Sequence, residues 1–364
     1  MLLFFCIHEK SDMMAGVTYK CPSCGAYLAF DPAEQKWKCD FCESVFTEED
    51  LLPKSDAFAQ AAAREQSAPE EAENEVLYHC PSCGSEIMTG ETTVATHCYY
   101  CHNPVVLQGK LTAGMKPEQV LPFAIGKEDA VKKFMDWAGK KKFIPRAFFS
   151  EQGVQEMSGV YYPHFVTECE MDGSFQGEGR NISRMDTPTH IVTKTDYYTF
   201  RRRANIVFRN VMRPALKSAD RKLSDGIHPF PLEAVKPFSS AYLSGFLAER
   251  RDIDSADIAE NVQSELKGYI KPMLAQSLHY SSYSGEVSAT ALRQNSRYVL
   301  LPTWVLTYKG RKDPKGQVYY YAMNGATGAV CGKLPIDKGK LLRFGLLVGG
   351  AVFAALCLGG YFLW

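Results

Sequence analysis

The chain has 364 residues, 46% of them hydrophobic, and its 41 Lys and Arg balance its 41 Asp and Glu. This composition excludes a disordered chain and allows two or three folding units with at least one sizeable core. The balanced total conceals a split. Residues 1–110 carry 7 basic residues against 17 acidic ones, whereas residues 111–335 carry 31 against 23. An acidic front therefore precedes a basic middle.

The N-terminal residues 1–16 are expected to be disordered. The apolar opening Met1–Ile7 is too short for a signal peptide, and no cleavage site follows it. Met13 and Met14 directly precede the first motif, so the translation start is expected there. Without a secretion signal, the twelve cysteines are expected to face a reducing cytosol and not to form disulfides.

One short segment of the chain is repeated. Tyr19–Gly25 recurs as Tyr78–Gly84, and each copy is followed, at the same spacing, by a second Cys-x-x-Cys. This pattern indicates a duplicated module. A Cys-x-x-Cys turn presents two sulfur ligands, so two turns complete a tetrahedral site. The spacing predicts two structural zinc ions, in modules 17–50 and 76–110 joined by the linker 51–75. Their ligands are Cys21, Cys24, Cys39 and Cys42 in the first module and Cys80, Cys83, Cys98 and Cys101 in the second.

Other interpretations of the cysteines are a catalytic zinc, a thioredoxin-like redox pair and a rubredoxin-like iron site. We favour structural zinc, because each set already has four thiol ligands and no βαβ context is present. Gly25 and Gly84 directly follow the first Cys-x-x-Cys turn, or knuckle, of each module, where the absence of a Cβ lets the turn curl. Three histidines next to these cysteines are expected outside the ligand set: His79, His97 and His102. The remaining cysteines are expected to be small apolar residues: Cys6, Cys169, Cys331 and Cys357.

The charge of the modules bears on what they bind. The first carries three lysines against seven acids, and the second carries one lysine against two. Phosphate binding needs a net positive surface, so protein binding is favoured over nucleic-acid binding. Four aromatic residues are candidates for stacking on bases or proteins: Trp37, Phe41, Tyr99 and Tyr100.

Residues 111–335 predict an α+β domain with mostly antiparallel strands. Helices are expected at 127–140 and at 255–278, with Ser255 as the N-cap of the second. Strands are expected at 159–170, 191–199, 203–211, 297–308 and 317–323. Asp172-Gly173 suggests a hairpin, residues 310–316 a polar turn, and Asn324-Gly325 with Thr327-Gly328 a further reversal.

One basic run, Arg201–Arg203, is followed by Arg209 and Arg213. Strand alternation places Arg201, Arg203 and Arg209 on one face. Together with Lys140–Lys142, this face is a candidate for contact with anionic lipid headgroups or with the acidic modules, the alternative being a solvated sheet face. The sequence contains no P-loop, dinucleotide fingerprint, Gly-x-Ser-x-Gly or His-Glu-x-x-His motif, so no enzyme is predicted.

The C-terminal segment 344–364 carries no charge and is rich in Leu, Val, Ala and Gly. A helix of this length measures about 31 Å and matches the hydrocarbon core of a bilayer. The basic juxtamembrane segment 336–343 precedes it, so the positive-inside rule keeps the bulk of the chain in the cytoplasm. The sequence therefore predicts a single-pass, tail-anchored protein of the cell membrane. A buried core helix is the alternative interpretation.

The cysteine modules resemble zinc ribbons of the transcription-factor-IIB type. Three downstream segments, Pro237–Glu249, Leu301–Trp304 and Ala322–Gly328, are similar to a bacterial family of tail-anchored zinc-ribbon membrane proteins, largely uncharacterised. Members of that family are often labelled helicase-like or primosomal, and some accompany phage-shock-type envelope-stress proteins. The resemblance implies a recruiting role at the membrane.

Three functions follow as hypotheses. The favoured one is a membrane-anchored adaptor or scaffold that recruits cytosolic proteins to the inner face of the cell membrane, in the context of envelope stress. The alternative is a membrane-tethered nucleic-acid-binding zinc-ribbon protein. The third is an enzyme whose site the sequence conceals in the middle domain.

Overall fold

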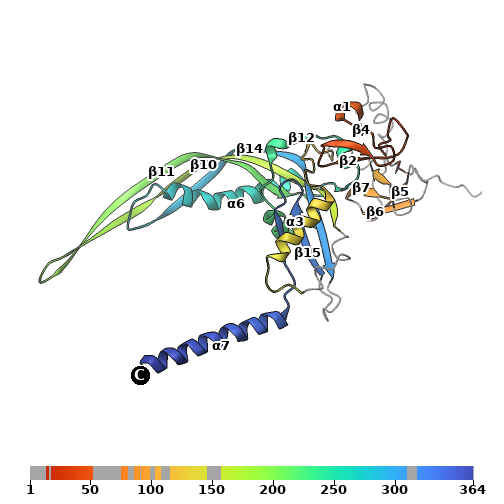
Figure 1. Cartoon of the computed structure of the whole chain (residues 1–364). Helices are drawn as coiled ribbons and strands as arrows, with labels where there is room; N and C mark the ends of the chain where they lie inside the picture. Colours follow the sequence, from red (N-terminus) through yellow and green to blue (C-terminus); the bar gives the residue numbers. More distant parts are fainter. Residues whose placement is uncertain are drawn as a thin grey trace, which may run out of the picture.

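The computed structural model describes residues 14–15, 18–51, 75–80, 86–90, 92–98, 103–107, 115–145, 157–309 and 318–363. Within these ranges the molecule consists of a large sheet with helices on it, two three-stranded sheets, and one C-terminal helix that projects from the body (Figure 1). The structure confirms the prediction of a large sheet domain with mostly antiparallel strands.

The large sheet has ten strands, and three of them are long: β10 (Ser158–Asp186), β11 (Ile191–Pro214) and β14 (Ser282–Lys309). β10 lies between β11 and β14 and pairs antiparallel with both over nearly its whole length. Beyond the body, the three strands continue as a curved antiparallel ribbon (Figure 1), which we call the blade. The predicted strands at 191–199 and 203–211 are therefore one continuous strand, and the strand expected from 297 begins at Ser282.

The Asp172-Gly173 hairpin prediction is wrong. Both residues lie inside β10, where Gly173 is paired with Ala204 on β11 and with Ala289 on β14. A Cβ at Gly173 would lie 2.7 Å from Cγ2 of Ile270, so the glycine is required by close helix packing. The chain reverses only after the end of β10, where the Thr187 N–H donates to the His190 carbonyl.

Helix α6 (Ser255–Ala275) covers one face of the blade. Its buried residues recur every four positions and form one apolar stripe. They are Ile258, Val262, Leu266, Ile270 and Leu274. The N-cap is Asp254, not the predicted Ser255, and it forms a capping box with Asp257.

The shorter elements close the body. Helix α3 (Lys127–Gly139) matches the predicted helix and buries Ala130, Phe134 and Ala138. The remaining strands of the sheet are β7 (Thr93–His97), β8 (Pro104–Val106), β9 (Gln119–Val120), β12 (Lys236–Pro237), β13 (Leu247–Glu249), β15 (Val318–Asn324) and β16 (Val330–Gly332). The predicted reversal after β15 is confirmed, since the Asn324 side chain accepts from the backbone N–H groups of Ala326 and Thr327. The predicted turn 310–316 lies outside the described residues.

The two cysteine modules attach to this body differently. The first contributes β2 (Leu28–Asp31), β3 (Lys36–Cys39) and β4 (Val45–Phe46), which form their own sheet, and the short helix α1 (Glu48–Leu51). In the second, β7 and β8 belong to the large sheet, because β7 pairs with β13 at Ala95 and Ala248. β5 (Glu75–His79) and β6 (Glu86–Gly90) pair with each other, and β5 also pairs with β1 (Met14–Ala15).

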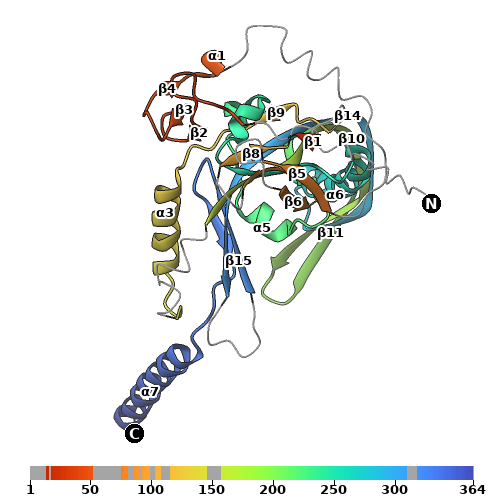
Figure 2. The same cartoon turned by 90° about the vertical axis from the view of Figure 1, so that its right-hand side faces the viewer.

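The C-terminal helix α7 spans Lys338–Leu363. Its segment Lys338–Gly359 is long and apolar enough to cross a membrane, and no residue of its most apolar window is buried against the rest of the molecule. The helix begins beside the loop after α3 and then leaves the body (Figure 2). A packed core helix would be covered by protein, so the alternative of a core helix does not fit.

Candidate metal centre

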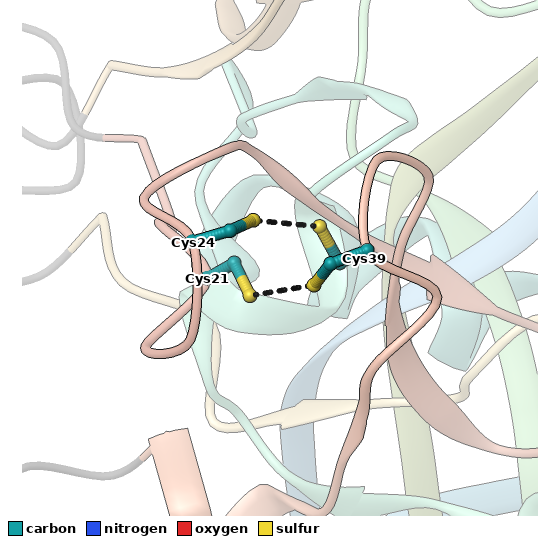
Figure 3. Close-up of side chains that lie close together, drawn as sticks. Cys21, Cys24 and Cys39 are labelled. Carbon is teal, nitrogen blue, oxygen red and sulfur yellow. Dashed lines mark hydrogen bonds between the residues drawn. The ribbon is translucent and has the colours of Figure 1, made fainter.

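Four cysteine sulfurs of the first module converge on one point. Figure 3 shows Cys21 and Cys24 on one turn of the chain, facing Cys39 on the other. The fourth ligand, Cys42, follows Cys39 in the second Cys-x-x-Cys turn. The four Sγ atoms lie within 4.8 Å of one another, and the pairs Cys21–Cys42 and Cys24–Cys39 are each separated by 3.6 Å. Bonded sulfurs lie about 2.05 Å apart, so these are thiols and not disulfides. Sulfurs at the corners of a tetrahedron around zinc lie about 3.8 Å apart, given a Zn–S distance of about 2.3 Å.

Local backbone turns aim these sulfurs inward. In the first knuckle the Gly25 N–H donates to the Cys21 carbonyl, and Gly25 has a φ of 75°, which a residue without Cβ adopts readily. In the second knuckle the Glu43 N–H donates to the Cys39 carbonyl, and Glu43 takes the same left-handed conformation with a φ of 58°. The predicted role of Gly25 is confirmed. The cluster has the ligand type, number and spacing to bind one metal ion.

One side of the first module packs on the body through aromatic rings. Phe30 and Trp37, on neighbouring strands, lie 5.2 Å and 5.1 Å from the ring of Tyr242, measured between centroids. Trp37 is 1% exposed, and its Nε1–H donates to the Ala241 carbonyl over 2.9 Å. The expectation that Trp37 is free to stack on a partner is therefore wrong. Its ring is used to hold the module in place.

Hydrogen bonds reinforce this contact. One joins the Gln35 side chain to the Phe123 carbonyl, and most of the others lead to one segment, 237–249. The Tyr242 hydroxyl donates to Glu48 over 2.8 Å, the Ser244 hydroxyl donates to the Leu28 carbonyl, and the Phe30 N–H donates to the Ser244 carbonyl over 3.1 Å. Burial and the adjacent Glu48 carboxylate raise the pKa of Tyr242 above its ordinary value, so the hydroxyl stays protonated as a donor. The segment 237–249 stood out in the sequence only for its resemblance to a family, and no pattern in it predicts this docking role.

The other side of the first module faces solvent. Cys24 and Cys42 are exposed, and the Phe41 side chain between the second pair of ligands is 82% exposed. Asp40 and Glu43 flank it and are exposed as well. Aromatic side chains are enriched in protein–protein interfaces, so Phe41 is a candidate contact residue.

For the second predicted site, the structure describes only two ligands. Cys80 and Cys98 are 1% and 0% exposed and pack with Val105 and Leu107 in a small core. Cys83 and Cys101 lie outside the described residues, as do Gly84, Tyr99, Tyr100 and His102. The Cys98 N–H donates to the Asn103 carbonyl over 2.9 Å. The second zinc stays a prediction.

A cavity of about 460 Å³ lies between α5 (Arg221–Gly226), β10 and β15. His164 lines it, with Nε2 3.0 Å from the Ser224 hydroxyl and Nδ1 3.1 Å from the Tyr162 carbonyl. Since a carbonyl only accepts, Nδ1 carries the proton and Nε2 accepts from Ser224. Burial lowers the pKa of His164 to about 4, so the ring is neutral at pH 7. Both ring nitrogens are thus satisfied inside the fold, and among the described residues no carboxylate hydrogen-bonds to this ring; the pair ties α5 to β10.

The basic run on β11 is partly neutralised within the fold. Arg203 forms a two-point hydrogen bond with the Asp172 carboxylate, at 3.0 and 2.6 Å. Arg213 contacts Glu265 of α6 at 2.6 Å. The acidic partner raises the pKa of Arg203, and Arg203 lowers the pKa of Asp172, mainly through these hydrogen bonds. Arg201 remains exposed on the blade.

Comparison with known proteins gives one relative and no activity. A Bacillus subtilis (strain 168) protein described as "Uncharacterized protein YdjG" is 29% identical over 347 residues, which cover 93% of this chain and 96% of that protein. No protein-family model matches the chain. No solved structure matches it either. The alignment extends over nearly the full length of both chains, and the description of that protein names no activity, ligand or partner.

Proposed function

We propose that this protein is a membrane-anchored zinc-ribbon adaptor that recruits cytosolic proteins to the inner face of the cell membrane, in the context of envelope stress. In this proposal α7 crosses the membrane once, and the rest of the chain lies in the cytoplasm. The two cysteine sets hold one structural zinc ion each, and the molecule is not an enzyme.

The observation that carries the proposal is the two-sided first module. Its inner side is fixed by Trp37 and Tyr242, and its outer side presents Phe41 with Asp40 and Glu43. Phe41 is 82% exposed, so a partner can reach its ring without any rearrangement of the module. Because the module is held rigidly, a partner that binds Phe41 does not have to order it first, which lowers the entropic cost of binding.

The charge of the segment before α7 supports the orientation. Lys338, Lys340 and Arg343 lie at the start of the apolar helix, and the rest of the described part of α7 carries no charge. Positive residues next to a membrane helix favour the cytoplasmic side. The acidic surface around Phe41 favours a partner with a basic or apolar binding segment over nucleic acid.

The test is affinity capture with the full chain, solubilised in neutral detergent, comparing wild type with Phe41→Ala. Tyr269→Ala is the matched control, because Tyr269 is also an exposed aromatic residue, 53% exposed, but lies on α6. Proteins that are lost with Phe41→Ala and retained with Tyr269→Ala support the adaptor. Capture of nuclease-sensitive material would instead favour the nucleic-acid alternative, and capture unchanged by Phe41→Ala would reject this surface.

Membrane insertion is tested separately by fractionating cells and extracting membranes with alkali. The full chain is expected in the alkali-resistant fraction, and a chain that ends before Phe344 is expected in the soluble fraction. A truncated chain that stays with the membrane after alkali would contradict the anchoring role of α7.

A further inference from the structure

Two basic segments far apart in sequence meet at the start of α7. The first is the loop Lys140–Ile144 after α3, and the second is 334–343, which leads into α7. The Asp337 N–H donates to the Phe143 carbonyl over 2.7 Å, and the Lys340 Nζ donates to the Ile144 carbonyl over 2.7 Å. In both views the loop after α3 reaches the start of α7 (Figures 1 and 2). We call these two segments together the collar.

Aromatic contacts extend the collar onto the apolar helix itself. The rings of Phe143 and Phe344 lie 5.4 Å apart, edge to face, and Lys142 Nζ lies 5.9 Å from the centre of the Phe344 ring. Lys141 Nζ likewise lies 5.8 Å from the Trp137 ring. Tryptophan and long basic side chains of this kind are enriched where a protein meets the headgroup layer of a membrane.

The surface of the collar is amphipathic. It contains a shallow depression of about 380 Å³, lined by Lys140–Ile144 and by Leu334–Ile336. Ile336 is 62% exposed at its edge, and Leu342 in the first turns of α7 is 65% exposed. Basic side chains around an apolar depression match the chemistry of a phospholipid, which has an anionic headgroup above acyl chains.

The charge of the collar is strongly positive. Residues 140–144 and 334–343 contain six Lys and Arg but only one acid, Asp337. The Asp337 carboxylate accepts from the Lys340 N–H at the start of α7 and so serves as a helix cap. Lys140–Lys142 also follow the C-terminus of α3, where positive charge stabilises the helix dipole. That role explains one or two basic residues and does not explain a second basic segment brought to the same place.

We infer that the collar is a binding site for the headgroups of anionic phospholipids, which dock the domain on the membrane surface around α7. The inference rests on the proposed membrane span of α7. It assigns a lipid partner to a surface that the recruitment of proteins does not use. Each lysine near an anionic surface contributes about a fivefold gain in binding.

The test measures lipid binding to the purified full chain in neutral detergent micelles at 0.1 M salt. Phosphatidylglycerol is titrated against phosphatidylcholine and against inorganic phosphate. The triple variant Lys140→Gln, Lys141→Gln, Lys142→Gln is expected to bind phosphatidylglycerol about 100-fold more weakly. The triple Lys→Arg variant at the same positions is expected to retain binding, which guards against misfolding as the cause. The charge-matched control is Arg201→Gln, Arg202→Gln, Arg203→Gln on the blade, expected to change affinity by less than about threefold.

Three outcomes would overturn the inference. They are equal binding of phosphatidylglycerol and phosphatidylcholine by wild type, an equal loss in the Arg201–Arg203 control, and competition by inorganic phosphate as strong as that by the lipid. If the full chain fails the alkali-extraction test, the membrane span itself is wrong. If it passes that test and the lysine variant binds lipid normally, only the collar inference fails. Because the measurement contains no other protein, its result leaves the role of Phe41 unaffected.

Discussion

The two cysteine modules share one spacing but attach to the molecule by different means. The first packs through Phe30 and Trp37, whereas the second places β7 in the large sheet. When the two copies are aligned on their cysteines, Phe30 and Trp37 correspond to Thr89 and Thr96, which are both buried. Aromatic rings bury a large area in a side-chain contact, while β-branched residues suit a strand. The two copies thus share the same Cys-x-x-Cys spacing although they attach to the body differently. The residues between the two Cys-x-x-Cys turns determine how each copy attaches.

Both attachments lead to the same place. η4 (Ser240–Leu243) receives the first module, and β13, which follows it closely in the chain, pairs with β7 of the second. β13 also pairs in parallel with β10, at Val160 and Leu247. The segment 237–249 therefore joins both modules to the start of β10 in the large sheet, and changes in either module can be compared against one common support.

The largest expected effect is the loss of a metal ion on removal of a cysteine ligand, which tests the two predicted metal sites separately. Cys39→Ser removes a ligand from the described cluster, so the chain should lose one metal ion and, with it, on the order of 10 kcal/mol of metal-binding free energy in the first module. Metal content is measured by elemental analysis of the purified protein, and protease sensitivity reports unfolding of residues 18–51. Cys331→Ser, outside both sets, is the control. Cys98→Ser should lower the metal content by one ion only if the second cysteine set is a complete metal site. Unchanged metal content in Cys39→Ser would contradict a metal site at Cys21, Cys24, Cys39 and Cys42.

Next in size is the aromatic contact of the first module. Trp37→Ala removes a fully buried ring and is expected to lower the free energy of unfolding by about 3–5 kcal/mol. Trp37→Phe keeps most of the ring but loses the hydrogen bond to Ala241, for about 1 kcal/mol. Thr96→Ala, at the equivalent position of the second module, should cost about 1 kcal/mol. Urea unfolding measures all three, and a Thr96→Ala effect as large as that of Trp37→Ala would erase the contrast between the modules.

The second module is tested through its backbone. Ala95 pairs with Ala248 on one side and with Val106 on the other. Ala95→Pro removes a ladder donor and is expected to cost about 3 kcal/mol. Hydrogen exchange should then rise at 104–106 and 247–249 and remain unchanged at 28–39. Ala95→Gly keeps the N–H and serves as the control. Normal protection in Ala95→Pro would mean that β7 is not held by this pairing.

The smallest effect concerns the body that carries both modules. Burial lowers the pKa of His164 from 6.5 to about 4, so between these pH values the unfolded chain binds a proton that the folded chain does not. The free energy of unfolding is therefore unaffected by protonation of His164 above pH 6.5 and falls as the pH drops toward 4, by at most about 3 kcal/mol. His164→Asn should flatten this part of the profile of urea midpoint against pH. An unchanged slope would place the acid sensitivity in another group.

Local patterns in the sequence predicted the local structure well. The repeated cysteine spacing predicted a cluster that the structure forms at Cys21–Cys42, and the apolar periodicity predicted α3 and α6. The apolar C-terminal run predicted a helix able to span a membrane. These features depend on residues close together in the chain, where turn geometry, helix periodicity and span length leave few alternatives.

Features set by distant contacts were predicted poorly. Asp172-Gly173 is a strong turn signal by itself, yet Gly173 admits Ile270 and Asp172 pairs with Arg203, and both partners lie on other elements. The burial of Trp37 likewise depends on Tyr242, which lies far along the chain in η4. No periodicity in the first module shows which of its faces will be covered. Phe41 and Trp37 are therefore grouped together by sequence, although one is exposed and the other buried.

The hydrogen bonds within the collar, between the loop after α3 and the start of α7, limit how far the domain can move relative to α7. A flexible linker of n residues has an average span of about 5–6 Å times the square root of n, and the tethered domain explores that whole volume. Here Asp337 and Lys340 are hydrogen-bonded to Phe143 and Ile144, so almost no flexible linker separates the domain from α7. With α7 in a membrane, a ligand held at Phe41 would sit at a set height above it. Its effective concentration against membrane targets would then depend on the shape of the domain and not on chain statistics.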